Sequence, residues 1–193
     1  MPGARVTRDG ETGVTLRTTE PDDADFVQRG LTNPEIRYPL GSSIRSRAET
    51  ESWLTETDGD GGFLVCLDDP SSGSASESGR RIGAVSIDDA DWRRPELAYW
   101  LVPEVHGEGY GTAAVSLLID YVFRTYDHPA VGASAYAFND ASRGLLESLG
   151  FEQEGVIRRD RFVDGAYVDT VQYGLLREDW WADREDERRR MAE

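Results

Sequence analysis

The apolar and polar positions in the first half of the chain form short runs that predict strands and two early helices. Val14 to Arg17 reads as the first strand. The segment Glu20-Pro21-Asp22-Asp23 places acidic residues and a proline where a helix begins, and Asn33-Pro34 is expected to break that helix. The other predicted elements of this half are a helix at 45–57 and strands at 63–67, 81–87 and 97–102.

In the second half, helical and extended patterns alternate more regularly. Asn139 caps a helix that runs to Leu149, and Asp164-Gly165 is a strong hairpin signal. The predicted elements here are a helix at 112–126, a buried strand at 131–138, the Asn139 helix, a hairpin of strands at 151–163 and 167–175, and a helical segment from Arg177.

This order of elements predicts an α/β fold of the mixed α+β kind. We expect one domain at residues 13–180, built on a central, mostly antiparallel twisted sheet flanked by helices. Residues 1–12 are expected to form a flexible tail, and residues 181–193 a charged, helical one.

The charge of the chain is strongly one-sided. The formal net charge is −16, and all 21 basic residues are arginine. One interpretation is adaptation to a salty cytoplasm in an organism with a GC-rich genome; another is an acidic groove that attracts a cationic substrate. Charge alone does not separate them. Nucleic-acid binding is disfavoured, because the usual footprint of such binding is a basic patch.

Other classes of function are limited by what the sequence lacks. No apolar run approaches the roughly 20 residues that span a bilayer, and the N-terminus has no apolar secretion segment, so we expect no membrane association and a cytoplasmic location. Cys66 is the single cysteine and reads as a buried, inert thiol. His106 and His128 are too isolated to predict a metal site.

The segment His106-Gly107-Glu108-Gly109-Tyr110-Gly111 carries the clearest chemistry. It follows a strand and precedes a helix, and its glycines let backbone N–H groups approach a ligand at a helix N-terminus, where the helix dipole favours anions. A pyrophosphate fits such a turn. A P-loop requires a lysine, which the chain lacks, and the third glycine falls one place too early for a Rossmann fingerprint.

The chain resembles the GNAT superfamily of acetyltransferases. His106, Gly109 and Gly111 match its Gln/Arg-x-x-Gly-x-Gly/Ala signature, except that His106 stands where Gln or Arg is usual. The segment from Asn139 to Phe151 is similar to the second family signature, at the expected separation. Residues 95–101 and 154–169 resemble the branch that contains ribosomal-protein N-terminal (alanine) acetyltransferases. The resemblance covers roughly residues 14–180 and implies the GNAT fold.

Acetyl-CoA is the co-substrate that the resemblance implies, with no metal. Backbone groups of Leu101 and Val102 would pair with the pantetheine arm. The resemblance assigns the pyrophosphate to His106, Gly107, Glu108, Gly109, Tyr110, Gly111 and Thr112, and further cofactor contacts to Asn139, Ser142 and Arg143. Each of the last three also has a structural interpretation: a helix N-cap, a helix-start residue and a solvated arginine.

For catalysis, Glu96 is our candidate base for the acceptor amine, and the Val102 N–H is a candidate to polarise the thioester carbonyl. Many family members place a tyrosine acid where this chain has Leu146. Ser142 and Tyr136 are the candidate substitutes. Tyr38, Trp92 and Tyr99 are candidates to line the acceptor pocket, although core packing explains any one of them as well.

The acceptor implied by the resemblance is an amine, with a protein N-terminus as the first choice. Acetylation of a small amine, such as a polyamine or an aminoglycoside, is a second interpretation. A third is an acyl-CoA-binding sensor without catalysis, which the loss of the tyrosine and the change at His106 favour. Homodimers are common in the family, so the partner set includes a second copy of the chain.

Overall fold

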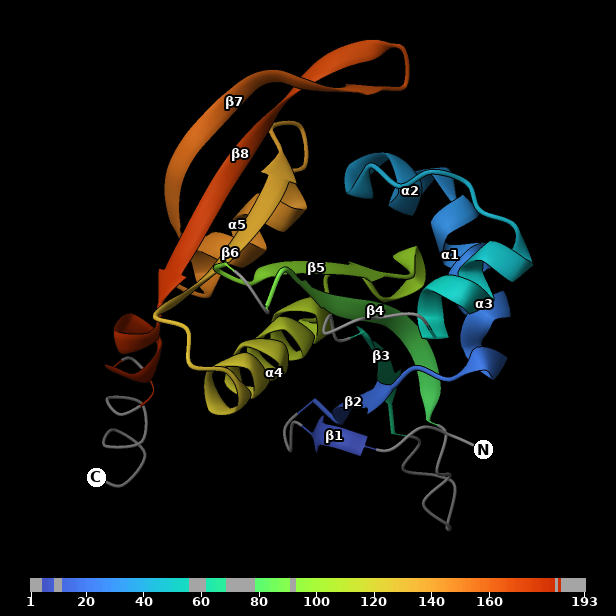
Figure 1. The fold of residues 1–193 in the computed structure, drawn as a ribbon, viewed down its shortest axis with the longest axis horizontal. Coiled ribbons are helices and arrows are strands. Elements are labelled where there is room, and N and C mark those ends of the chain that lie inside the picture. The colour runs from blue at the N-terminus through green and yellow to red at the C-terminus, as the bar shows by residue number, and fades with distance from the viewer. Residues whose placement is uncertain are drawn as a thin grey trace.

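Helices flank a twisted eight-stranded sheet in the computed structural model, which describes residues 5–8, 12–55, 62–68, 79–90, 93–182 and 184 (Figure 1). The strands are β1 (Arg5–Arg8), β2 (Val14–Thr18), β3 (Gly62–Leu67), β4 (Arg80–Asp88), β5 (Glu96–Leu101), β6 (Ala130–Tyr136), β7 (Glu152–Val163) and β8 (Ala166–Leu176). The helices are α1 (Ala24–Thr32), α2 (Pro34–Leu40), α3 (Arg47–Thr55), α4 (Tyr110–Thr125) and α5 (Asp140–Ser148), with single 3-10 turns at Pro21–Asp23 and Pro103–Val105 and a helical segment at 177–182.

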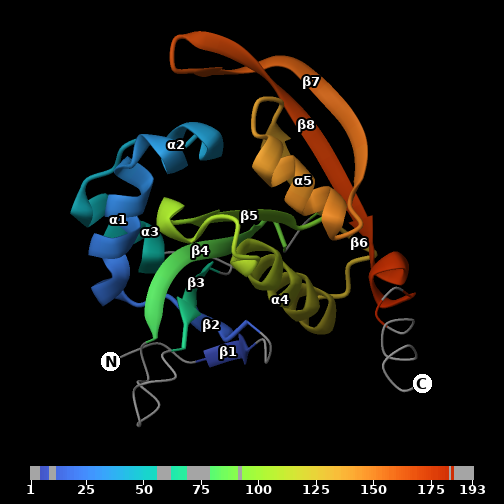
Figure 2. The same cartoon turned by 180° about the vertical axis from the view of Figure 1, so that it is seen from behind.

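The sheet has the order β1-β2-β3-β4-β5-β6-β8-β7, and its neighbours are antiparallel except for β5 and β6. That parallel pair meets only where Glu96 and Leu97 face Gly132 and Ala133. Beyond Leu97 the two strands diverge, and β6, β7 and β8 rise away from β5 as an arm (Figures 1 and 2). The divergence leaves a wedge-shaped break in the middle of the sheet.

Side-chain alternation along the strands divides the interior into two layers. Leu97 of β5 joins the main core, which α4 fills with buried residues such as Leu118 and Val122. Trp100, three residues on, packs on the other face against Val27 and Leu31 of α1. Because successive strand residues point to opposite faces, α4 and α1 lie on opposite sides of β5.

The α1 layer depends on one glycine. The Trp100 indole lies so close to α1 that a Cβ on Gly30 would stand 2.3 Å from the ring. Phe26, one turn earlier on the helix, stacks on the same indole with ring centroids 5.6 Å apart. This contact fixes the distance between α1 and the strand that carries the site.

The mixed fold, its mostly antiparallel sheet and the helix break at Asn33-Pro34 are confirmed, whereas the prediction for residues 5–8 is wrong and the short helix α2 was not predicted. Residues 5–8 form β1 and pair with β2, where a flexible tail was expected. Asn33-Pro34 separates α1 from a further helix, α2, because the Asn33 side chain accepts the Glu35 N–H at 3.0 Å and Pro34 occupies the first turn. The end of the helix predicted at 45–57 lies outside the described residues.

Candidate active site

A cleft of about 1010 Å³ opens where β5 and β6 diverge. In Figures 1 and 2, α2 faces β6 and α5 across β5, and residues from all four elements line the cleft. It brings together most of the residues that the sequence singled out: Glu96, Tyr99, Leu101, His106, Gly107, Gly109, Tyr110, Gly111, Thr112, Tyr136, Asn139 and Ser142. Val102, Glu108 and Arg143 are not among its lining residues, and Trp92 lies outside the described residues.

The glycine turn forms one end of the cleft. Gly107 and Gly109 both have φ of +81°, a left-handed conformation that costs little only for glycine. A Cβ on either residue would meet no heavy atom within 4 Å, so the space beside the turn is open. The first turn of α4 carries no acidic residue, in spite of the chain's acidity. Its N–H groups and helix dipole are therefore suited to attract an anion.

His106 braces this turn against β5. Its Nε2 lies 3.1 Å from the Leu101 carbonyl oxygen, so the ring links the start of the turn to the end of the strand. His106, which stands where the family usually has Gln or Arg, thus contacts the β5 backbone, whereas the resemblance implied a contact with phosphate.

The backbone of β5 corrects the role expected for Val102. The Val102 N–H donates to the Ile82 carbonyl oxygen at 2.8 Å, so it faces β4 and is occupied. Backbone groups alternate in direction along a strand, and Pro95, of the opposite parity, directs its carbonyl to Gly132 of β6 at 2.8 Å. The N–H groups of Tyr99 and Leu101 therefore face the break between β5 and β6.

A hydroxyl pair joins β5 to α5 inside the cleft. The Tyr99 hydroxyl lies 2.7 Å from Ser142 Oγ, and it also donates to the Ser142 carbonyl oxygen at 3.3 Å. Asn139 Oδ1 accepts the Ser142 N–H at 3.1 Å, which caps α5 and holds Ser142 in place. Burial raises the pKa of Tyr99 to about 12, so its phenol stays protonated at neutral pH.

The other candidate acids are less suited to the chemistry. Leu146, at the usual tyrosine position, is fully buried in the main core. The Tyr136 hydroxyl packs against Gly41, the left-handed residue that ends α2, where an added Cβ would stand 2.0 Å from it. Tyr136 therefore closes the contact between β6 and α2.

Glu96 begins β5 on the α1 face of the sheet. Its carboxylate lies over the backbone of Gly132, where a Cβ would come within 2.3 Å of Oε1. Burial raises the pKa of Glu96, and the neighbouring arginines Arg94 and Arg93 oppose that rise. A carboxylate with a raised pKa inside a cleft is suited to accept a proton.

Two other predicted residues lie beside the cleft. Arg143 turns back beneath α5, where its Nε donates to the Tyr173 hydroxyl at 3.3 Å. Tyr38 lines a neighbouring groove of about 530 Å³ between α2 and the β7–β8 hairpin, together with Phe138, Val163 and Val168. Glu35 and Pro39 line both spaces, so the groove adjoins the cleft.

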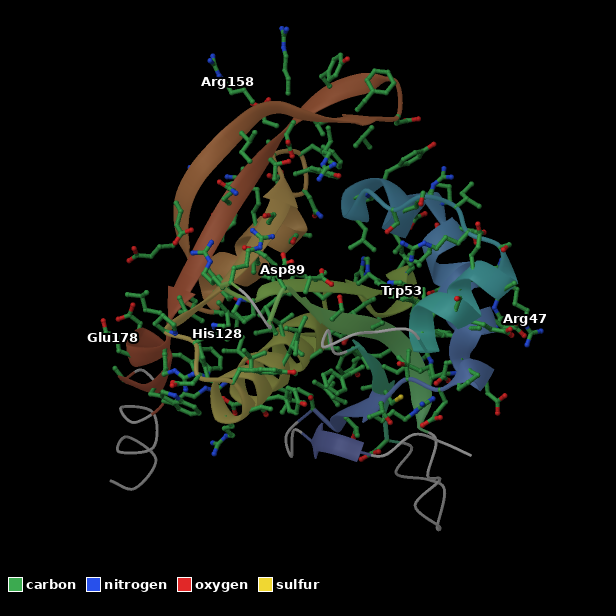
Figure 3. All side chains as sticks on the ribbon, in the orientation of Figure 1. Arg47, Trp53, Asp89, His128, Arg158 and Glu178 are labelled. Atoms are coloured by element: carbon green, nitrogen blue, oxygen red, sulfur yellow. The ribbon has the colours of Figure 1, made fainter. Side chains whose placement is uncertain are left out.

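The remaining candidates carry structural contacts. His128, which Figure 3 labels, follows the C-terminal end of α4, and its Nε2 lies 2.7 Å from the Ala90 carbonyl oxygen. Within the described residues there is no cluster of His, Cys, Asp and Glu suited to a metal ion. Cys66 is buried, and burial raises the pKa of its thiol. Among the residues that the structure describes, no helix is long and apolar enough to cross a membrane.

Known proteins agree with this architecture. Residues 14–152 match the model of the acetyltransferase (GNAT) domain family. YdaF of Bacillus subtilis, provisionally named a ribosomal N-acetyltransferase, is 36% identical over 104 residues, or 53% of this chain and 57% of YdaF. The uncharacterized N-acetyltransferase YoaA of the same species is 32% identical over 85 residues, or 44% of this chain and 48% of YoaA. The chain thus aligns with about half the length of these relatives.

Two solved structures share the fold over nearly the whole chain. The spermidine N-acetyltransferase of Vibrio cholerae, solved with CoA and spermine, has a TM-score of 0.77 at 21% identity and covers 89% of this chain and 99% of its own. RimL, a ribosomal L7/L12 α-N-protein acetyltransferase solved with coenzyme A, has a TM-score of 0.75 at 16% identity and covers 90% of this chain and 98% of its own. With the family match across the cleft, these findings establish that the chain belongs to the GNAT acetyltransferase family.

Proposed function

We propose that the protein transfers the acetyl group of acetyl-CoA to a primary amine, and that the amine is the N-terminus of a protein. One observation carries the proposal. At the break in the sheet, β5 directs Glu96 to one face, Tyr99 with its partner Ser142 to the other, and free backbone N–H groups into the space between them. A base, a hydroxyl donor and an oxyanion site thus converge on one cleft.

The cofactor end of the cleft fits the proposed co-substrate. The open, left-handed glycine turn and the first turn of α4 would take the pyrophosphate. Backbone groups of Tyr99 and Leu101 would pair with the amide-bearing arm, as a neighbouring strand does. Bound acetyl-CoA supplies the thioester, whose carbonyl carbon the amine attacks.

The residues of the chain account for each proton. The neutral amine attacks the thioester carbonyl carbon, and Glu96 takes the proton that its nitrogen then loses, directly or through water. The Tyr99 N–H, which lies closer along β5 to Glu96 than Leu101 does, would face the negative charge that develops on the carbonyl oxygen. Ser142 donates a hydrogen bond to the departing sulfur. A thiol has a pKa of about 8.5, well below the value of about 12 for Tyr99, so Tyr99 orients Ser142 and keeps its own proton.

Two features support a protein N-terminus as the acceptor. An α-amino group has a pKa of roughly 8, against about 10 for an alkylamine, so at physiological pH a much larger fraction of it is neutral and able to attack the thioester. The adjoining groove gives the residues that follow the amine an apolar surface of Tyr38, Phe138, Val163 and Val168. The relationship to YdaF is consistent with this acceptor.

A polyamine is the second candidate. Glu35 and Asp160 line the same cleft as Glu96, and carboxylates spaced along a cleft attract a polycation. Because Asp160 also accepts the Thr170 hydroxyl at 2.8 Å, one of these acids is already engaged.

The proposal is tested by calorimetric titration with acetyl-CoA in high salt, followed by turnover assays on peptide and polyamine panels. We expect saturable binding that is lost in Gly109→Glu, and turnover of peptides with free N-termini that acetylated peptides do not support. Turnover of spermidine alone would establish the second candidate. Tight binding without turnover of any amine would establish a sensor, and the absence of binding would remove the assignment.

A further inference from the structure

Two glycines on adjacent strands form a shallow trough across the sheet, next to the candidate base. Gly132 of β6 pairs with Glu96 of β5 on one side and with Gly174 of β8 on the other. A Cβ on Gly132 would stand 2.3 Å from Glu96 Oε1, and a Cβ on Gly174 would stand 2.1 Å from Glu154 Oε1. The carboxylates of Glu96 on β5 and Glu154 on β7 therefore each lie against the backbone of a glycine in the strands between them.

Arg94 spans this trough and joins the two carboxylates. Its Nη1 donates to both oxygens of Glu154, at 2.7 and 2.8 Å, and its Nη2 lies 3.6 Å from Glu96 Oε1. The ideal Cβ positions of Gly132 and Gly174 are each 3.0 Å from an Arg94 nitrogen, so the guanidinium also needs both glycines. The network connects β7 to the first residue of β5 across β6 and β8.

Glu154 reaches Arg94 because β7 has a bulge at this point. The register against β8 shifts between Gln153 and Gly155, so Glu154 is the extra residue. Bulges redirect a side chain that would otherwise follow the alternation of its strand. Arg94 is thereby held by a charge-assisted contact to both oxygens of one carboxylate while it keeps a looser contact with Glu96.

We propose that Arg94 is a positioning residue for Glu96: Glu154 fixes the guanidinium, and the guanidinium holds the Glu96 carboxylate in the orientation that receives the acceptor's proton. The inference rests on the proposed function, in which Glu96 is the base. Glu154 has a second effect. By holding the guanidinium at 3.6 Å from Glu96, it prevents a close ion pair that would weaken the base.

Other charged groups near Glu96 set the background. Arg93, in the same segment as Arg94, is paired with Asp89, and Asp88 of β4 stands opposite Glu96 in the register. Glu154 adds a second negative charge from β7. Of these groups, Glu154 is the one bonded to Arg94, so Arg94→Gln is compared with Glu154→Gln to separate the contribution of the guanidinium from that of the Glu154 charge.

The test is a carbon-13 NMR titration of the Glu96 carboxyl group in the intact protein, with its signal assigned by its loss in Glu96→Gln. Arg94→Gln removes a favourable charge, and we expect the Glu96 midpoint to rise by about one pH unit. Glu154→Gln frees the guanidinium to close on Glu96, and we expect the midpoint to fall.

The matched control is Glu51→Gln, which removes a carboxylate from an ion pair with Arg47 at the far side of the molecule (Figure 3). It should leave the Glu96 midpoint in place. In turnover assays the acid limb of the kcat/KM profile should move with the NMR midpoint. In Arg94→Lys, which keeps the positive charge, both should lie close to their wild-type values.

The outcomes separate the two proposals. Opposite shifts in Arg94→Gln and Glu154→Gln support the positioning role, even in a sample for which no acceptor has been found. An unchanged midpoint in both variants overturns it, whatever happens to stability. If the shifts occur but Glu96→Gln turns over normally, the network is real and the assignment of Glu96 as the base is wrong.

Discussion

The Tyr99 hydroxyl lies 2.7 Å from Ser142 Oγ, which joins the strand at the centre of the cleft to the first turn of α5. Ser142 is the group that contacts the departing sulfur in the proposed reaction, and Tyr99 orients it. We expect Ser142→Ala to lower kcat by roughly tenfold to a hundredfold, the effect of one lost hydrogen bond to a charged atom.

Tyr99→Phe is expected to lower kcat by about tenfold or less, because it loosens Ser142 without removing it. In the Ser142→Ala background the same change should have almost no further effect, since the two residues act as one unit. Tyr121→Phe is the control, because Tyr121 packs edge-on against Phe63 within the core layer. Fully additive losses in the double variant would contradict the coupling.

Substitutions at two left-handed glycines should lower folding stability equally but differ in their effect on acetyl-CoA affinity. Gly109→Ala imposes a side chain on a residue with φ of +81°, which costs about 1 kcal/mol of folding stability and displaces the N–H groups beside it. Gly165 in the β7–β8 turn has φ of +85° and equally open surroundings, so Gly165→Ala should lose similar stability. Only the Gly109 variant should weaken acetyl-CoA binding in calorimetry.

Glu96→Gln is expected to lower turnover by about a hundredfold or more and to increase stability at neutral pH. Because burial raises the pKa of Glu96, the folded state binds this proton more tightly than the unfolded chain. The stabilising contribution is therefore present below the usual glutamate pKa and is lost as the pH rises through the raised value. Thermal melts should show that the variant's advantage grows with pH, and a constant difference would contradict this sign.

The buried pair of Arg17 and Asp23 predicts sensitivity to acid. Arg17 contacts both oxygens of Asp23, at 2.7 and 2.9 Å, and Arg81 adds a third contact at 3.1 Å. Burial opposes the ionisation of Asp23, but these hydrogen bonds and the Glu20 N–H outweigh it and lower its pKa. Its contribution to stability is present above the unfolded-state pKa and is lost as the pH falls through the lowered value.

Asp23→Asn should therefore cost about 3–5 kcal/mol, because it leaves a buried guanidinium uncompensated. Urea denaturation at neutral pH measures this cost. The difference between variant and wild type should shrink in acid, where the wild-type carboxylate is protonated too.

The net charge of −16 predicts that the melting temperature rises from dilute buffer to molar salt, because salt screens the repulsion among the surface carboxylates. Differential scanning calorimetry across a salt series checks this. A melting temperature independent of salt would contradict it.

The sequence predicted features that depend on local pattern. Strand and helix periodicity located nearly every element, and the spacing of Gly107, Gly109 and Gly111 located the turn at the start of α4 that we propose binds the pyrophosphate. Asn33-Pro34 ends α1 as predicted, but the same pair also begins α2, and only the Asn33 contact with the Glu35 N–H reveals this second role.

Features that depend on strand direction or on a bulge were not predictable. Whether Val102 or Leu101 faces the cleft follows from the pairing of β5 with β4, which no local pattern specifies. Arg94 and Glu154 are 60 residues apart in the chain, and they meet because a bulge in β7 turns Glu154 toward Gly174. Isolated charged residues in so acidic a sequence gave no signal of this contact.

The break between β5 and β6 has a consequence for the life of the protein in the cell. Two sections of the sheet meet directly over only two residue pairs, at Glu96 and Leu97. An extended ligand that lies along the free edge of β5 would bridge these two sections, because its hydrogen bonds replace those that β5 and β6 do not make with each other. By mass action, a ligand at a hundred times its dissociation constant adds about 2.7 kcal/mol to folding stability. The resistance of this chain to proteolysis should then follow the supply of its co-substrate, so that metabolic state sets the lifetime of the protein as well as its rate of turnover.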